Sequence, residues 1–110
     1  MNLRNRVQLI GNMGKNPMVK ELNNGGKMAR FSLATNEFFV KDGERVKETQ
    51  WHSLVAWGKT ADIIAEHMQS GVEMLVGGKL KNRTYTDTAG TTRYITEVVV
   101  DEVLFRSKQQ

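Results

Sequence analysis

The amino-acid sequence predicts an all-β domain with one α-helix, folded as a small closed or partly open barrel. Five segments are rich in Val, Ile, Thr and aromatic residues and show stretches of apolar–polar alternation, the pattern of half-buried strands. Clusters of Gly and Asn separate these segments, and only one stretch has helical spacing. A chain of 110 residues suffices for one core, so we expect a single domain over residues 1–106 and a short disordered end at 107–110.

The predicted elements follow in the order of three strands, a helix and two strands. The strand segments are residues 7–10, 28–39, 49–57, 72–86 and 92–105. Residues 23–26 and 87–90 contain the Asn, Asp and Gly that tolerate positive φ, so both are predicted hairpin turns. The helix is expected at 59–70, where Ile63, Ile64, His67 and Met68 share one side and Gly71 stands at C′. Residues 40–48 carry near-balanced charge and are interpreted first as a mobile surface loop and second as a contact for the ligand.

Composition excludes several classes of protein. The absence of Cys excludes a disulfide framework, thiolate metal sites and a thiol nucleophile, and agrees with a reducing compartment. No apolar run reaches the ~20 residues of a membrane span and no signal peptide is recognisable, so we expect a cytoplasmic protein. The formal net charge is +4, with the basic excess in residues 1–30 and 79–93, which indicates a polyanionic partner such as nucleic acid.

Alternation gathers aromatic and basic side chains on strand faces. In the segment 49–57, Trp51 and Trp57 share one side, and His52 points to the other. In the next strand a basic row ends in an aromatic residue: Lys79, Lys81, Arg83 and Tyr85. Three alternating cations cannot form a core face. Flat aromatics beside cations supply the two contacts that a single strand of nucleic acid needs, stacking for bases and charge for phosphates.

No catalytic motif is present in the sequence. His52 and His67 are the only histidines, and their spacing matches no metal motif. No Ser lies in G-x-S-x-G, and residues 77–80 lack the first Gly and the Ser or Thr of a phosphate-binding loop. We therefore expect no enzymatic activity, cofactor, metal or small-molecule substrate. The helix carries Asp62 and Glu66, which does not fit a helix that reads a duplex groove.

Five segments, taken in order, resemble the bacterial single-stranded DNA-binding protein family (SSB). They are VQLIGNMGKNP, NNGGKMARFSLATNE, TQWHSLVAWGKTADIIAEHM, VGGKLKNRTYTD and TRYITEVVVDEVLF. The resemblance runs from about Leu3 to Phe105, and it is specific because the motifs occur in order at matching spacings. It implies an oligonucleotide-binding (OB) fold, a five-stranded Greek-key barrel with the helix between strands three and four. It also implies non-catalytic, sequence-tolerant binding to single-stranded DNA in replication, recombination and repair, and a nucleoid-associated location.

The resemblance also carries functional residues onto matching positions of this chain. It implies base stacking on four aromatic side chains, Phe39, Trp51, Trp57 and Tyr85. It implies phosphate contacts at Lys59, Arg83 and Arg93, to which the basic row adds Lys79 and Lys81, with Arg4 and Arg6 as weaker candidates. The family's subunit interface corresponds to the first strand, with Val7 and Leu9, and to His52. We expect a homodimer formed by strand pairing and, as in the family, a homotetramer.

Two alternatives to this function stay open. One is an OB-fold primosome accessory or RNA-binding protein, and the other is a protein-interaction module whose basic face meets acidic partners. Equal or better binding to RNA favours the first, and no binding to oligo(dT) at low salt favours the second. The family typically continues into a flexible linker and an acidic tip that recruits replication proteins, whereas this sequence ends at Gln110. We therefore do not expect tail-mediated partners.

Overall fold

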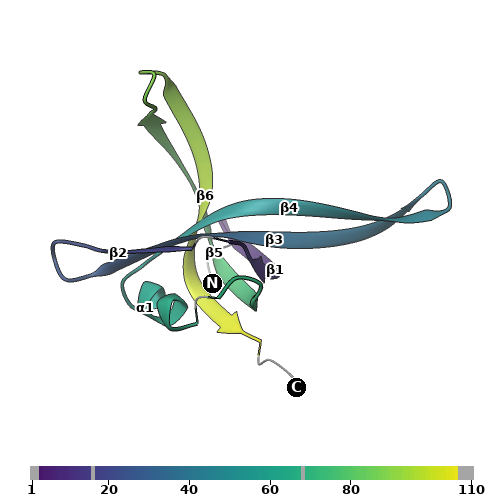
Figure 1. Ribbon diagram of the computed structural model, residues 1–110, viewed down its shortest axis with the longest axis horizontal. Coiled ribbons are helices and arrows are strands. Elements are labelled where there is room, and N and C mark those ends of the chain that lie inside the picture. Colours follow the sequence, from purple (N-terminus) through teal and green to yellow (C-terminus); the bar gives the residue numbers. More distant parts are fainter. Residues whose placement is uncertain (1–2, 16, 68, 107–110) are drawn as a thin grey trace.

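The computed structural model describes residues 3–15, 17–67 and 69–106, which form a barrel with two projecting hairpins (Figure 1). The elements are β1 (Val7–Met13), β2 (Met18–Glu21), β3 (Lys27–Lys41), β4 (Glu44–Trp57), α1 (Gly58–Glu66), β5 (Glu73–Thr86) and β6 (Thr92–Phe105). The β3–β4 hairpin runs to the right of Figure 1 and the β5–β6 hairpin runs to the top. These projections raise the radius of gyration to 15.9 Å, above the about 13 Å of a compact domain of this length.

The strands close into a barrel. Their order in the sheet is β1-β5-β6-β4-β3-β2, and a further pairing of β1 with β3 joins the two sides at Asn12↔Ala34 and Met13↔Leu33. All pairings are antiparallel except that of β4 with β6. Gly11 is required at the closure because a Cβ there would collide with the carbonyl oxygen of Ala34. Five long strands with a helix between the third and the fourth confirm the predicted OB arrangement.

Alternate side chains of the long strands fill the barrel. The largest fully buried ones are Leu33, Leu54, Ile64, Met74, Val55 and Val76. All but Val55 belong to the core cluster inside the barrel. Helix α1 packs across one end, and its Ala61 and Ile64 are wholly buried there. Burying a side chain such as Ile64 stabilises the fold by about 1.5–3 kcal/mol, so the single helix contributes to the core as well as linking β4 to β5.

Strand β2 and the end of helix α1 differ from the sequence prediction. Strand β2 was not expected, because all four of its residues are exposed and therefore show no alternation. It pairs with β3 through the predicted turn at 23–26, where the Leu22 N–H donates to the Gly26 carbonyl (2.8 Å). Helix α1 ends at Glu66 instead of residue 70, since His67 leaves helical geometry (φ −112°) and the Gly71 N–H bonds the Met13 carbonyl of β1. Met68 and the end at 107–110 lie outside the described residues.

The prediction of a loop at residues 40–48 is wrong, because the structure shows a continuous hairpin there. Strands β3 and β4 stay paired as far as Lys41↔Glu44, and only Asp42 and Gly43 form the turn. Both turn residues have positive φ, 52° and 80°, which matches the twist of the flanking strands in a two-residue hairpin. The Asp-Gly pair is the sequence signal for this turn. The hairpin therefore has a fixed register up to its tip.

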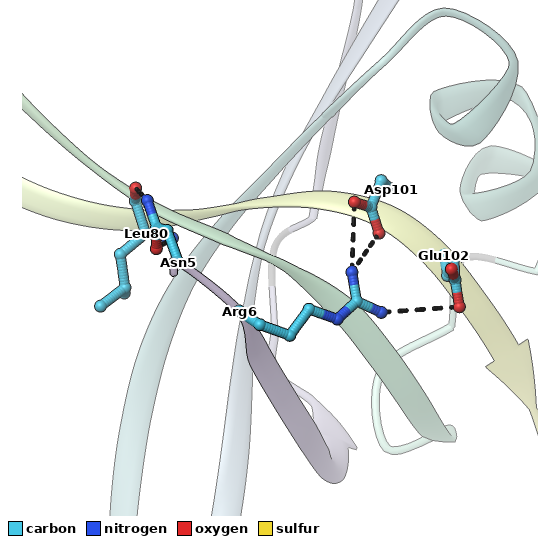
Figure 2. Close-up of polar contacts among 5 residues, drawn as sticks. All are labelled: Asn5, Arg6, Leu80, Asp101 and Glu102. Atoms are coloured by element: carbon cyan, nitrogen blue, oxygen red, sulfur yellow. Dashed lines mark hydrogen bonds and ion pairs between the residues drawn. The ribbon is translucent and has the colours of Figure 1, made fainter. Parts of the chain in front are cut away.

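A bulge in β6 redirects its side chains and is held by the N-terminal segment. Gly77 and Gly78 of β5 pair with Glu102 and Val100, so Asp101 has no partner and the inward parity of β6 changes there. Arg6 binds the bulge, with Nη1 donating to Asp101 (3.1 Å) and Nη2 lying 3.6 Å from Glu102 (Figure 2). The Asn5 side chain exchanges two hydrogen bonds with the Leu80 backbone. Arg6 therefore has acidic partners of its own beside β1.

Candidate nucleic-acid interface

The strand register assembles one continuous outer face from four strands. Directly paired residues point to the same side of a sheet, and Lys79, Val99, Val55 and Arg30 are successive partners across β5, β6, β4 and β3. Alternation along each strand then places Trp51, Trp57 and Tyr85 on this same side. We call this surface the aromatic face. It brings together three of the four predicted stacking residues with the predicted basic row.

Three aromatic rings on the aromatic face are accessible. Trp51 is 63% exposed, Trp57 47% and Tyr85 44%. The Arg83 guanidinium lies 5.8 Å from the Tyr85 ring centroid, within range of a cation–π contact. Gly14 leaves room for Trp51, because a Cβ at Gly14 would press on the indole ring and on the Ser32 hydroxyl. Large aromatic rings left open beside cations provide surfaces on which bases can stack.

Glu97 of β6 is buried in the middle of the aromatic face. Its carboxylate is 4% exposed and accepts hydrogen bonds from Arg30 Nη1 of β3 (2.7 Å) and Arg83 Nε of β5 (2.8 Å). Burial raises the pKa of the Glu97 carboxyl, but the hydrogen bonds and charges of Arg83 and Arg30 outweigh burial and hold that pKa below its ordinary value. The carboxylate therefore fixes two arginines from opposite sides of β6.

Sequence reasoning did not find Arg30 or Glu97. In the structure Lys81 pairs with Glu97, because residues 87–91 separate the paired Thr86 and Thr92. A count from the predicted turn at 87–90 would pair Lys81 with Thr96, so the hairpin pattern alone would not have found Glu97. No local pattern connects Arg30 to these residues, because only the packing of β4 between β3 and β6 brings it there. A hollow of about 350 Å³ opens at this point, lined in part by Arg30, Ser32, Ser53 and Glu97.

The other predicted phosphate contacts divide into two groups. Lys59 at the start of α1, Lys79 and Lys81 are exposed, and none of them forms an ion pair with any residue that the structure describes. Arg93 Nε donates to Asp87 Oδ2 (2.9 Å). That bond, with the backbone N–H groups of Thr91 and Ala89, lowers the pKa of Asp87. The lysines offer unshared charge, whereas Arg83 and Arg93 already have carboxylate partners.

Phe39 does not lie on the aromatic face. Counting along β3 from Ala34, which pairs with Trp51, puts Phe38 on the side of Trp51 and Phe39 on the opposite side. Two side-chain contacts support this assignment, since Asn36 binds Thr49 (2.7 Å) and Arg45 covers the Phe38 ring (4.4 Å). The structure thus separates Phe39 from the other three predicted stacking residues, because the two-residue turn fixes the register of the hairpin.

The predicted interface residues do not lie on the aromatic face. Val7 and Leu9 are partly buried and pack against the core, so the outward residues of β1 include Ile10, which is 57% exposed. His52 is half-buried and lies on the opposite side of β4 from Trp51, with its Nε2 hydrogen-bonded to the Thr35 hydroxyl (2.9 Å). The separation of His52 from the aromatic face agrees with the alternation argument.

Residues 3–15, 17–67 and 69–106 hold no group of three or more His, Cys, Asp or Glu arranged to bind a metal ion. Over the same residues, no helix is long and apolar enough to cross a membrane.

An OB barrel that presents exposed aromatics and cations on one sheet face defines a protein that binds single-stranded nucleic acid. Comparison with known proteins makes the assignment more specific. Residues 4–106 match the Single-strand binding protein family, and the chain belongs to this family. A solved structure described as "Plasmodium falciparum SSB complex with ssDNA" is similar over 97% of this chain and 100% of that chain, with 34% sequence identity and a TM-score of 0.83. The family resemblance and the OB fold are thereby confirmed.

Proposed function

We propose that this protein binds single-stranded DNA with little sequence preference, by stacking bases on Trp51, Trp57 and Tyr85. The observation that carries the proposal is that three exposed aromatic rings lie on the same sheet face as the basic residues Lys79, Lys81 and Arg83. Stacking contributes about 1–3 kcal/mol per base and tolerates any base, because every base has a π face. The similar structure from Plasmodium falciparum is a complex with single-stranded DNA, which favours DNA as the ligand.

The phosphates are held by the cations around these rings. Lys59, Lys79 and Lys81 bind phosphates directly, since no carboxylate among the described residues neutralises them. Arg83 and Arg93 contact DNA from within their existing ion pairs. Neutralising phosphates releases counterions, so affinity falls as salt rises, with a slope of about −0.7 per phosphate contact on a single strand.

Family membership supports a role in covering and protecting single strands during DNA replication, recombination and repair. In this role the protein acts by binding alone, without catalysis, cofactor or metal, and it resides where single-stranded DNA is exposed, in association with cellular DNA. The sequence tolerance of stacking suits such a role, because a protein that coats DNA must accept any base order.

We further propose that the chain self-associates through the open edge of β1 and an apolar row that begins on that strand. Residues 7–11 of β1 pair with β5 on one edge only, which leaves the other edge open to a second copy. Ile10, Leu75 and Leu104 are successive partners across β1, β5 and β6 and form an apolar row, with Ile10 57% and Leu104 69% exposed. Pairing at β1 forms a dimer, and burial of the apolar row joins two dimers into a tetramer.

The proposed function is tested by titrating the intrinsic fluorescence of Trp51 and Trp57 with oligo(dT), duplex DNA and RNA at two salt concentrations. Strong quenching by oligo(dT), weakened by salt and small with duplex, is expected if bases stack on the indoles. Equal or stronger binding to RNA would instead support an RNA-binding function. An absence of quenching in a folded sample would exclude the stacking site. Sedimentation equilibrium tests self-association, which a monomer at all concentrations contradicts.

A further inference from the structure

The hollow of about 350 Å³ in the aromatic face has a methionine in its wall. Met18 of β2 and Arg30 of β3 are direct partners, so their side chains point to the same side of the sheet, and both line the hollow. The lining also includes Phe31, Leu54 and Ile95, which supply apolar surface beside the charged groups. Met18 therefore lies where the edge of the sheet meets the proposed DNA-binding surface.

Met18 is accessible, whereas the other methionines that the structure describes are buried. Met18 is 48% exposed. Strand β2 is the last strand in the order of the sheet and pairs with β3 alone among the described strands, so its outer edge is open (Figure 1). The three buried methionines are Met13 (2% exposed), Met28 (7%) and Met74 (1%). Met1 and Met68 lie outside the described residues.

Hydrogen peroxide converts a methionine thioether to a sulfoxide. A lone pair on sulfur attacks one peroxide oxygen, the O–O bond breaks as the S–O bond forms, and after proton transfer the products are the sulfoxide and water. The sulfur loses two electrons and the peroxide gains them. Peroxide can reach the Sδ atom of Met18 in the folded protein, whereas a buried sulfur reacts only after the fold opens. Exposure therefore selects Met18 for this reaction.

Oxidation of Met18 changes the polarity of the hollow. A sulfoxide replaces a flexible apolar side chain by a polar one that carries a hydrogen-bond acceptor. The Cβ atoms of direct partners in an antiparallel pair are about 4.5–5.5 Å apart, so the new oxygen can reach the guanidinium of Arg30. There it competes with a phosphate for the N–H donors of Arg30, and it removes apolar surface that a base could contact. Both effects weaken DNA binding.

We propose that Met18 is a site of oxidation by hydrogen peroxide, and that its sulfoxide lowers the affinity of the aromatic face for single-stranded DNA until a methionine sulfoxide reductase restores the thioether. Reduction consumes two thiols, which become a disulfide, and releases the sulfoxide oxygen as water, so the modification is reversible. The choice of Met18 depends only on its exposure. The effect on affinity rests on the proposed function.

Oxidation followed residue by residue tests the first part of the proposal. The folded protein is treated with hydrogen peroxide and digested, and mass spectrometry measures the gain of one oxygen atom at each methionine. Met18 is expected to react at least about tenfold faster than Met13 and Met74, because their sulfurs are accessible only in opened states. In protein unfolded in urea the rates are expected to be similar. A rate at Met18 no higher than the rates at the buried residues would overturn the site.

Met18→Leu and Met28→Leu form a matched pair for the effect on DNA binding. Both replace a methionine on the same side of the sheet by an apolar residue of similar volume, but only Met18 is exposed. Oligo(dT) binding is measured by tryptophan fluorescence before and after peroxide, with peptide maps confirming that Trp51 and Trp57 are unmodified. The oxidised wild type and oxidised Met28→Leu are expected to bind about fourfold more weakly, as for the loss of one buried methylene group. Met18→Leu is expected to bind equally well before and after treatment, and reductase is expected to restore the wild type.

The outcomes separate this proposal from the proposed function. Equal affinity of the untreated and the Met18-oxidised wild type would overturn the effect on DNA binding. A loss of affinity that persists in oxidised Met18→Leu would place the sensitive residue elsewhere and also overturn it. An untreated wild type that does not bind oligo(dT) at low salt would overturn the proposed function and the affinity effect together, while the mass measurement would still decide whether Met18 is the oxidised residue.

Discussion

Replacing Glu97 by Gln is expected to weaken the fold and strengthen DNA binding at the same time. The Glu97 carboxylate is 4% exposed and holds Arg30 and Arg83 at 2.7 and 2.8 Å. Glutamine preserves the shape of the side chain but removes its charge and presents an amide donor to one of the guanidinium groups. The two arginines, whose side chains are 30% and 36% exposed, then lose their shared counter-charge. The same substitution removes one negative charge from the aromatic face, whose net charge becomes more positive by one unit.

The magnitude follows from the two contacts. A hydrogen bond to a charged group contributes about 1.5–3 kcal/mol, and removing one partner of a buried ion pair costs about 3–5 kcal/mol. Water reaches about a third of each arginine side chain and screens part of the interaction, so we expect a loss of about 2–4 kcal/mol in the free energy of unfolding. At about 4 °C per kcal/mol for a domain of this size, Tm falls by about 8–16 °C.

The free energy of unfolding that Glu97→Gln loses also depends on pH. The pKa of Glu97 in the folded protein lies below its ordinary value of 4.5, so the carboxylate stabilises the fold fully above the unfolded pKa. That stabilisation disappears as pH falls through the folded pKa. The wild type and Glu97→Gln therefore differ most at neutral pH, and the difference between their stabilities shrinks in acid.

The assays are chemical denaturation at neutral and acid pH and oligo(dT) titration over a range of salt. We expect Glu97→Gln to bind more tightly at low salt and to show a slope steeper by up to about 0.7, since one more phosphate can be neutralised. Glu102→Gln is the control. It also removes one carboxylate, but the Glu102 side chain is 75% exposed and lies 3.6 Å from Arg6, so its ion pair is weak. Unchanged stability of Glu97→Gln would refute the structural role of the ion pairs. Weaker DNA binding by a folded variant would refute competition between Glu97 and phosphate.

Three other substitutions test separate parts of the structure. Trp57→Ala is expected to lose about 1–3 kcal/mol of oligo(dT) affinity, followed through Trp51 fluorescence, and unchanged affinity would remove Trp57 from the site. Gly43→Ala is expected to cost about 1–2 kcal/mol in chemical denaturation, because φ is 80° and no atom lies near enough to add a steric effect; a neutral result would contradict the turn geometry. Leu104→Asp is expected to lower the mass measured by sedimentation by breaking the apolar row, and an unchanged mass would show that the assembly does not use it.

The sequence predicted the fold class because its signals are local. Alternating apolar residues and the Asn, Asp and Gly of the turns define the five long strands, and alternation alone places Trp51 and Trp57 together, away from His52. The exposed strand β2 lacks this signal, and the end of α1 depends on a hydrogen bond from Gly71 to β1 that no helix pattern contains. Local periodicity therefore accounts for the long elements and fails for short or exposed ones.

The tertiary structure decided which of these side chains share a surface. Arg30 and Arg83 are 53 positions apart in the chain. They meet at Glu97 only because β5 pairs with one edge of β6, and β4, with β3 beside it, pairs with the other edge. Whether Phe38 or Phe39 lies on the side of Trp51 depends on the strand register. The Asp42–Gly43 turn fixes every residue pair in the outer part of the β3–β4 hairpin, and a shift of one residue would exchange the two sides of that hairpin. Composition showed a balanced charge in that segment, and only the paired strands separated it into a basic side and an acidic side.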